Sequence, residues 1–271
     1  MTRPTARFVN GEELESLNRY SNVVLVDLGT PELYARAHIP GALFLGYDRL
    51  VAKHGLTGGL IPPVEELAQT LSELGIGNDT LVIAYDDEGG GKAARLCWTL
   101  DCLGHHRWMV LNGGIQAWLD EKRPLSRAMP HPLRRGFIPR LRDEYIADAD
   151  HILEHLGCPD IALLDARSPE EFSGAQRFAR RAGHIPGAVN WEWTDALDPH
   201  RKLRLRPNHE LVAELTARNV VPQREVICYC QTHHRSSLSY AILRHLGYEH
   251  VRGYPGSWSD WGNRLDTPIA T

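Results

Sequence analysis

The stretch VVLVDLGTPELYARAHIPGALFL, residues 23–45, decides the fold, because a diverged copy of it returns later in the chain. The copy reads IALLDARSPEEFSG from Ile161 and, after a short insertion, AGHIPGAVNW up to Trp191. Self-similarity at a roughly constant spacing is the signature of a chain built from repeated structural units. The sequence therefore indicates an internal duplication.

Two more segments repeat in the same order. LVIAYDDEGGGKAARL at 81–96 matches EVICYCQTHHRSSL at 225–238. NGGIQAW at 112–118 matches YPGSWSDW at 254–261. Four matches in the same order are not easily accidental, so we interpret the chain as a divergent tandem repeat.

The duplication predicts two homologous domains, at residues 8–125 and 146–271. The segment between them, 126–145, contains three prolines and five arginines and has few periodic apolar positions. That composition is typical of an exposed connector.

Each half has the pattern of an α/β layer. The runs VVLVDL, IALLDA, LVIAY and EVICY are continuous and apolar, as expected for strands buried on both faces of a sheet. Thr30-Pro31 and Ser168-Pro169 each place a capping hydroxyl before a proline at the first helical position. We expect an α/β fold with two tandem domains, each a mostly parallel central sheet flanked by helices.

Composition excludes several classes of protein. The chain has 271 residues with 30 basic and 34 acidic side chains, so a basic coat for nucleic acid is not expected. It has no apolar run of about 18 residues, as a transmembrane helix needs, and no signal-peptide pattern at its start. Five cysteines, an odd number, argue against a secreted disulfide scaffold. We expect a cytoplasmic protein with reduced thiols.

Cys230 lies where a predicted strand ends and a predicted helix is about to begin, in VICYC-QTHH-RSSL. Ligands of open α/β sheets bind at the carboxyl ends of strands, and a helix start presents N–H groups there. Arg235 adds a positive charge, and His233 and His234 add more when protonated. Such surroundings lower a cysteine pKa from about 8.5 to roughly 3.5–7.5. Cys230 is therefore the predicted nucleophile, in a cradle that attracts anions.

Other interpretations of this segment stay open. Cys230 can be an inert small residue in a turn, and Cys228 and Cys230 can form a redox couple or half a metal site. We expect no metal, because no second cysteine pair has ligand spacing. Cys228, inside the strand, is predicted to be a buried small hydrophobe.

The matching loop of the first half is acidic. It begins Asp86-Asp87-Glu88, with aspartate in place of the cysteine, and three glycines follow. Paired carboxylates can act in acid–base catalysis or bind Mg²⁺. We nevertheless expect this loop to be structural and catalytically inactive.

These residues carry a resemblance. The chain resembles the two-domain rhodaneses, or thiosulfate sulfurtransferases, over nearly its whole length. The markers are D-x-R-x-x-x-E-F at 165–172, GHIPGA at 183–188, CQTHHRS at 230–236 and YPGSWSDWG at 254–262. The loop is similar to that of one bacterial subgroup. The resemblance implies an inactive N-terminal domain and a catalytic C-terminal one.

The resemblance also implies a mechanism. The Cys230 thiolate takes the outer sulfur of thiosulfate, sulfite leaves, and the persulfide passes its sulfur to cyanide or a thiol. The backbone N–H groups of residues 231–235 would cradle the persulfide, without metal or organic cofactor. The substrate-binding residues would be Gln231, Thr232, His233, His234, Arg235 and Trp193. We expect no nucleic acid, no membrane and a monomer.

The donor is left open by a departure from the family. Members of the family often carry an arginine where this chain has Glu171. The negative charge of the donor must then be bound by Arg235, by the histidines, or by Arg180 or Arg181. Arg167 is open to a structural role. The alternatives are 3-mercaptopyruvate as donor and a persulfide carrier for a protein partner. A cysteine-dependent phosphatase is less favoured, because the Cys–Arg loop is one residue shorter than in that class.

Overall fold

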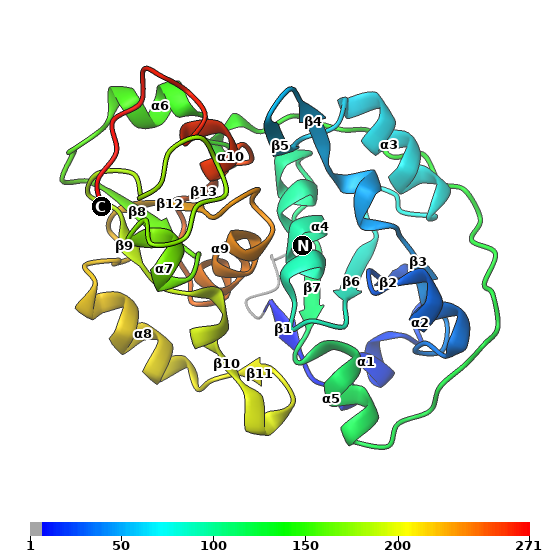
Figure 1. Ribbon diagram of the computed structural model, residues 1–271. Helices are drawn as coiled ribbons and strands as arrows, with labels where there is room; N and C mark the ends of the chain where they lie inside the picture. Colours follow the sequence, from blue (N-terminus) through cyan, green and yellow to red (C-terminus); the bar gives the residue numbers. More distant parts are fainter. Residues whose placement is uncertain (1–6) are drawn as a thin grey trace. The chain divides into compact units, whose positions relative to one another are not determined.

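The computed structural model describes residues 7–271, and the chain divides into two compact units. Of the residues described, the first unit contains 7–50, Pro62–Leu141 and Leu197–Leu205. The second unit contains Val51–Ile61, Arg142–Ala196 and Arg206–Thr271 (Figure 1).

The first unit is built on a parallel sheet of five strands. In spatial order the strands are β1 (Phe8–Val9), β7 (Trp108–Leu111), β6 (Leu81–Tyr85), β2 (Val23–Asp27) and β3 (Leu43–Phe44). The helices of this unit are α1 (Gly11–Leu17), α2 (Pro31–Arg36), α3 (Val64–Glu73), α4 (Gly91–Cys102) and α5 (Gly114–Asp120), with a 3₁₀ turn at Tyr47–Leu50.

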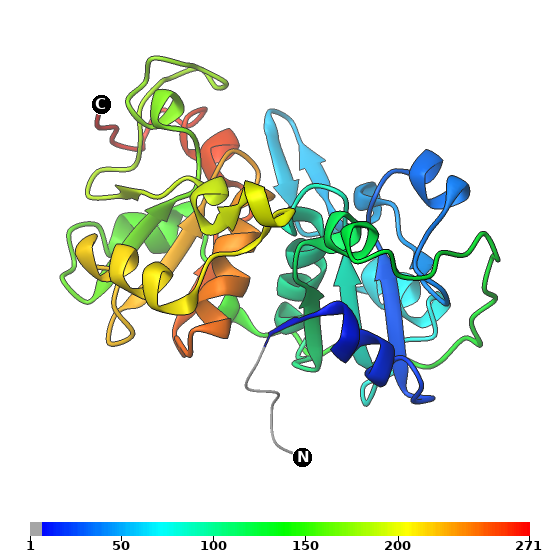
Figure 2. The ribbon, with the colours of Figure 1, turned by 90° about the horizontal axis from the view of Figure 1, so that it is seen from below.

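The second unit repeats this plan on a parallel sheet of four strands. Their order is β13 (Val251–Gly253), β12 (Glu225–Tyr229), β8 (Ile161–Asp165) and β9 (Val189–Asn190). Its helices are α6 (Ala149–Glu154), α7 (Pro169–Phe172), α8 (Asn208–Ala217), α9 (Arg235–His245) and α10 (Ser257–Trp261), with 3₁₀ turns at Asp143–Tyr145 and Trp193–Ala196 (Figure 2). The predicted fold class is confirmed.

The duplication is visible at the level of single hydrogen bonds. The Tyr85 hydroxyl accepts the backbone N–H of Ile39 at 3.2 Å, and the Tyr229 hydroxyl accepts that of Ile185, also at 3.2 Å. Each HIPGA turn is therefore anchored to the end of a central strand. The predicted helix starts are confirmed as well, since the hydroxyls of Thr30 and Ser168 cap α2 and α7.

Each unit also contains a hairpin from the other half of the sequence. The hairpin β4 (Ala52–His54) and β5 (Thr57–Leu60) clusters with the second unit. The hairpin β10 (Leu197–Asp198) and β11 (Arg204–Leu205), with a 3₁₀ turn at Pro199–Arg201 between its strands, clusters with the first. Sequence analysis did not anticipate this exchange, because both segments are short and lie inside their own repeat.

Most residues of the connector are exposed, as expected, but the segment packs on the first unit at a few points. Its residues up to Leu141 cluster with the first unit, and the Phe137 side chain is buried. The Arg135 guanidinium lies 2.8 Å from the carboxylate of Asp79. The segment therefore packs on the first unit before it enters the second.

Candidate active site

Cys230 immediately follows β12, a central strand of the second unit, and lies five residues before the start of α9. Its side chain is fully buried. The loop between them, residues 231–234, ends at His234, which is the N-cap of α9. This arrangement matches the predicted placement at the carboxyl end of a strand.

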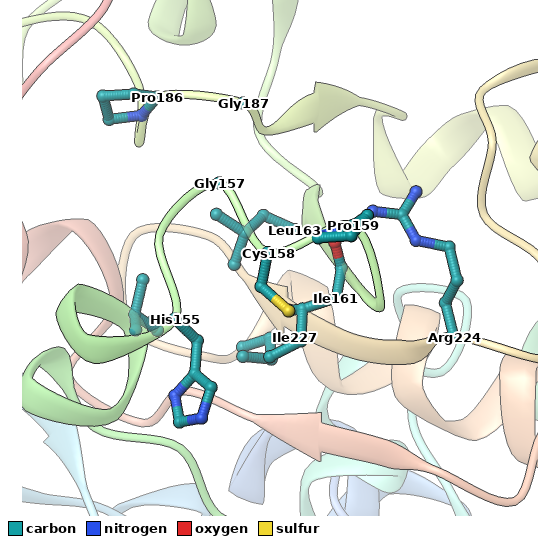
Figure 3. A pocket seen from close by; sticks show the side chains of 11 residues that line it. His155, Gly157, Cys158, Pro159, Ile161, Leu163, Pro186, Gly187, Arg224 and Ile227 are labelled. Carbon is teal, nitrogen blue, oxygen red and sulfur yellow. The ribbon is translucent and has the colours of Figure 1, made fainter.

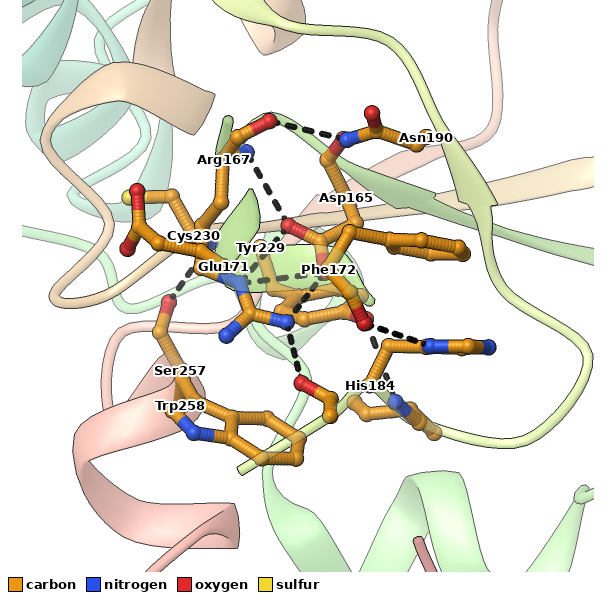
Figure 4. A network of polar contacts seen from close by, with 12 residues as sticks. Asp165, Arg167, Glu171, Phe172, His184, Asn190, Tyr229, Cys230, Ser257 and Trp258 are labelled. Atoms are coloured by element: carbon orange, nitrogen blue, oxygen red, sulfur yellow. Dashed lines mark hydrogen bonds and ion pairs between the residues drawn. The ribbon is translucent and has the colours of Figure 1, made fainter. Parts of the chain in front are cut away.

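One serine hydroxyl holds the loop in shape. Ser257 Oγ accepts the backbone N–H groups of Cys230 at 3.2 Å and of His233 at 3.1 Å, and it donates to the carbonyl of Tyr254 at 2.7 Å (Figure 4). The expectation that all N–H groups of residues 231–235 face the sulfur is therefore wrong for His233, whose N–H is taken by this serine.

Sequence reasoning missed Ser257, and the feature that marks this residue is visible only in the structure. Ser257 aligns with Gly114, and both have positive φ, 49° and 54°. A non-glycine residue rarely adopts that conformation, so its presence marks a position with a special task.

The β4–β5 hairpin supports the loop from another side. The backbone N–H of Gly58 donates to Ser259 Oγ at 3.0 Å, and Ser259 donates its own backbone N–H to the carbonyl of Gln231 at 2.9 Å. Gly59 packs against the backbone of Thr232, where a Cβ on the glycine would lie 2.1 Å from the carbonyl oxygen. The loop is therefore positioned by a segment more than a hundred residues away in the sequence.

The loop favours the ionised form of Cys230. Burial raises the pKa of this thiol, but the positive charge of Arg235, the Ser236 hydroxyl and the backbone N–H groups of Ser236 and Thr232 offset burial, so its pKa lies below the usual cysteine value. By contrast, burial raises the pKa of Cys228 well above that value. The geometry thus separates one activated thiol from a thiol that behaves as a buried hydrophobe.

Arg235 is bound to a carboxylate. Its Nη1 and Nη2 lie 2.5 and 2.8 Å from the two oxygens of Glu171, whose side chain is only 5% exposed. Burial raises the pKa of Glu171, but the Arg235 guanidinium outweighs burial and holds this pKa below its usual range. A bidentate pair of this kind is strong and fixes orientation.

The other arginines considered as donor contacts have different surroundings. Arg167 is buried, pairs with Asp165 at 2.6 Å and donates to the carbonyl of Gly183 at 2.8 Å (Figure 4). Arg181 donates to the carbonyls of Trp261 and Thr267. Arg180 is exposed on the surface.

The remaining predicted site residues gather around the loop. Gln231 is half-buried, and its Nε2 lies 3.3 Å from the carbonyl oxygen of Phe178. The buried His233 ring lies 2.8 Å from Ser236 Oγ, at a φ of 51°. Trp193 and His234 are half-buried, and their ring centroids are 6.2 Å apart. The structure therefore brings all six together on the second unit.

The matching loop of the first unit contains a carboxyl group, that of Asp86, in place of the thiol. The Asp86 carboxylate accepts the backbone N–H groups of Glu88, Gly89, Gly90 and Ala93, at 2.8–3.2 Å. This loop has the same length before its helix as the Cys230 loop. A loop of this type can therefore surround a negative charge with backbone donors.

A separate cavity of about 160 Å³ lies near the start of β8 in the second unit. Cys158, His155 and Arg224 line it together with apolar side chains (Figure 3). Cys158 precedes the first residue of β8, whereas Cys230 follows the last residue of β12, which runs parallel to β8. The two cysteines therefore lie at opposite ends of the sheet, and Cys158 is not part of the site around Cys230.

Two features are absent from residues 7–271. No group of three or more histidine, cysteine or acidic side chains there is placed to hold a metal ion. None of the helices described is long and apolar enough to cross a membrane.

Comparison with known proteins gives a consistent result. The description "Rhodanese-like domain" matches residues 10–121 and again 148–264. The chain is 47% identical over 247 residues to the thiosulfate sulfurtransferase of Azotobacter vinelandii, covering 91% of this chain and 90% of that protein. It is 37% identical over 256 residues to the sulfur carrier protein TtuD of Thermus thermophilus, covering 88% of this chain and 87% of that protein. The crystal structure of YnjE matches all of this chain and 70% of its own, with a TM-score of 0.89 and 25% identity.

Proposed function

Because this chain belongs to the rhodanese family of sulfurtransferases, we propose that it moves sulfane sulfur from thiosulfate to cyanide or a thiol through a persulfide on Cys230. The observation that carries the proposal is the contrast between the two homologous loops. One loop holds a carboxylate in a ring of backbone N–H groups, and the other holds a thiol whose pKa is lowered. The second loop therefore has the donors needed to hold a charged sulfur atom.

The reaction consists of two transfers. The Cys230 thiolate attacks the outer sulfur of thiosulfate, a sulfur–sulfur bond forms, and sulfite leaves with the electron pair of the bond that breaks. Cyanide or a thiolate then attacks the terminal sulfur of the persulfide, giving thiocyanate or a new persulfide and regenerating the Cys230 thiolate. Each transfer is balanced without an external oxidant or reductant, as in covalent catalysis generally.

The loop residues have distinct proposed roles. The N–H groups of Thr232 and Ser236, which already lower the pKa of Cys230, would stabilise negative charge on the persulfide. Arg235 would add a full positive charge. The half-buried rings of Trp193 and His234, and the Gln231 side chain, would form the wall against which the donor rests.

The direct test is a Cys230→Ala variant in a thiosulfate:cyanide assay. The variant is expected to form no thiocyanate while retaining the circular dichroism spectrum and melting temperature of the wild type. Activity in the variant would overturn the assignment. Turnover of an aryl phosphate by the wild type that disappears in Cys230→Ser would instead favour the phosphatase alternative.

A second candidate is a persulfide carrier with little free turnover. The similarity to a sulfur carrier protein favours it. The two candidates differ in rate and not in chemistry. A persulfide that forms with thiosulfate but reacts far faster with a captured protein acceptor than with cyanide or small thiols would support the carrier.

We also propose that the protein works as a monomer in the cytoplasm. All five cysteines are free, as expected for a reducing compartment. Light scattering coupled to size-exclusion chromatography tests the monomer, since one chain has a mass of 30.5 kDa.

A further inference from the structure

We propose that Glu171 is the charge-compensating partner of Arg235 and sets a preference of the Cys230 site for singly over doubly charged sulfur donors. This inference rests on the proposed sulfur transfer. It deepens that proposal by assigning a specificity-determining role to a residue that touches neither the thiol nor the reacting sulfur.

The first step of the argument is the position of Arg235. As the first residue of α9 it lowers the pKa of Cys230, and it is bound through both terminal nitrogens to Glu171. Glu171 is held in turn by a capping box, in which it exchanges hydrogen bonds with Ser168. The guanidinium therefore already has a fixed and nearly buried counter-charge.

The second step is the balance of charge. When Cys230 is ionised, one guanidinium faces two anions, and the Glu192 carboxylate also lies within electrostatic range of Arg235. Arg167 and Arg181 are bound to other partners, and Arg235 is the cation whose charge lowers the pKa of the Cys230 thiol. The positive charge of Arg235 is therefore already balanced by Glu171, so a second negative charge on the donor weakens donor binding.

The third step is the strength of the effect. Coulomb interactions between partly buried charges are several times stronger than in bulk water, so neutralising Glu171 changes donor binding measurably. Glutamine at this position has the same shape and still accepts a hydrogen bond from Arg235 and from the Ser168 N–H. The substitution therefore changes charge while retaining most of the contacts.

The experiment compares two donors with the same leaving chemistry and different charge. Thiosulfate carries two negative charges, and methanethiosulfonate carries one and releases methanesulfinate in place of sulfite. Steady-state kcat and KM are measured for both donors with cyanide as acceptor. The proteins are the wild type, Glu171→Gln and the matched control Glu170→Gln, which removes the same charge from an exposed neighbour.

In Glu171→Gln, kcat/KM for thiosulfate is expected to rise about tenfold relative to kcat/KM for methanethiosulfonate. Most of this change is expected as a lower KM for thiosulfate. A tenfold change corresponds to about 1.4 kcal/mol. Glu170→Gln is expected to leave the ratio of the two donors unchanged. An unchanged ratio in Glu171→Gln, or a shift toward methanethiosulfonate, would overturn the proposal. If Glu171→Gln does not fold, Glu171→Asp serves in its place, because the shorter side chain moves the carboxylate away from Arg235. This variant is expected to shift the donor ratio in the same direction by a smaller factor. An unchanged ratio in Glu171→Asp would contradict the proposal.

A second readout does not depend on turnover. The thiolate absorbance of each protein, minus that of its Cys230→Ser counterpart, gives the pKa of Cys230, which is expected to fall in Glu171→Gln and not in Glu170→Gln. A wild type that uses neither donor would refute the proposed function, whereas an unchanged Cys230 pKa would refute the role of Glu171. The two failures are therefore distinguishable.

Discussion

Gly59 lies so close to Thr232 that a Cβ on the glycine would stand 2.1 Å from the Thr232 carbonyl oxygen, well inside van der Waals contact. Gly59 also has a φ of 72°, which glycine adopts without strain and other residues rarely adopt. A glycine from the N-terminal half of the sequence thus packs against the backbone of the loop that follows Cys230 in the C-terminal half. The N-terminal half of the sequence therefore contributes to the loop around Cys230 as well as to its own Asp86 loop.

Gly59→Ala is expected to lower kcat for sulfur transfer more than tenfold, because the added methyl group pushes the Thr232 carbonyl, and with it the N–H groups facing Cys230, out of position. The matched control is Gly55→Ala in the same hairpin, where φ is also positive, 58°, and a Cβ would meet no atom within 4 Å. That variant should lose about 1 kcal/mol of unfolding free energy at unchanged kcat. Equal kinetic losses in both variants would show that contact with Thr232 is not the cause.

Ser257→Ala is expected to weaken both the fold and the reaction. The substitution leaves the N–H groups of Cys230 and His233 without their buried acceptor, and an unpaired buried donor costs about 1–3 kcal/mol. Urea unfolding and steady-state kinetics measure the two losses. Ser173→Ala, in an exposed position, is the control and should behave as the wild type; an unaffected Ser257→Ala variant would contradict the role of this hydroxyl.

The pH dependence follows from the lowered pKa of Cys230. Burial raises this pKa, but Arg235, the Ser236 hydroxyl and two backbone N–H groups bring it below the usual thiol value. The rate of persulfide formation should therefore persist below the pH at which ordinary thiols protonate, and should fall as pH drops through the Cys230 pKa. Arg235→Gln removes the cation, raises the Cys230 pKa and moves this acidic limb to higher pH. A pH–rate profile whose acidic limb stays at the same pH in Arg235→Gln would contradict the assignment of this limb to Cys230.

The same shift predicts a linkage with stability. Because the folded state lowers the pKa of Cys230, the thiolate stabilises the fold fully above the unfolded-state pKa, and this stabilisation is lost as pH falls through the folded-state pKa. The unfolding free energy of the wild type, compared with that of Cys230→Ser, should increase with pH across that window. A difference that does not vary with pH would mean that folding does not favour the thiolate.

The buried pair Asp165–Arg167 should be essential for the second unit. Both side chains are almost inaccessible, and the Arg167 guanidinium also stacks 4.4 Å from the ring centroid of Trp258. Removing one member of a buried pair strands the other charge, at about 3–5 kcal/mol. Asp165→Asn should lower the unfolding free energy accordingly, whereas Asp266→Asn, in an exposed pair with Arg264, should leave it unchanged. Equal effects in urea titrations would contradict the structural role of Asp165.

Much of this arrangement was predictable from the sequence because it depends on local pattern. Continuous apolar runs predicted the central strands, and Ser168-Pro169 predicted the start of α7. The duplication placed Asp86 opposite Cys230, and the structure gives both residues the same position between a strand and a helix. Local signals of this kind survive because neighbours in sequence remain neighbours in the fold.

The features that were missed depend on contacts between distant segments. No pattern at Gly58 or Gly59 points to the Cys230 loop, and nothing in the sequence pairs Glu171 with Arg235, 64 residues away. Ser257 aligns with Gly114, but the positive φ that both share, which marks the position, is seen only in the structure. Tertiary packing decides such contacts, and one sequence does not reveal them.

The measurement that tests the central claim most directly is peptide-resolved mass spectrometry of the protein after incubation with thiosulfate. The wild type and Cys158→Ser are expected to gain one sulfur atom, on the peptide containing Cys230, and to lose it on addition of cyanide. Cys230→Ser is expected to gain none. Sulfur that remains in Cys230→Ser, or that maps to Cys158 in the wild type, would contradict the account.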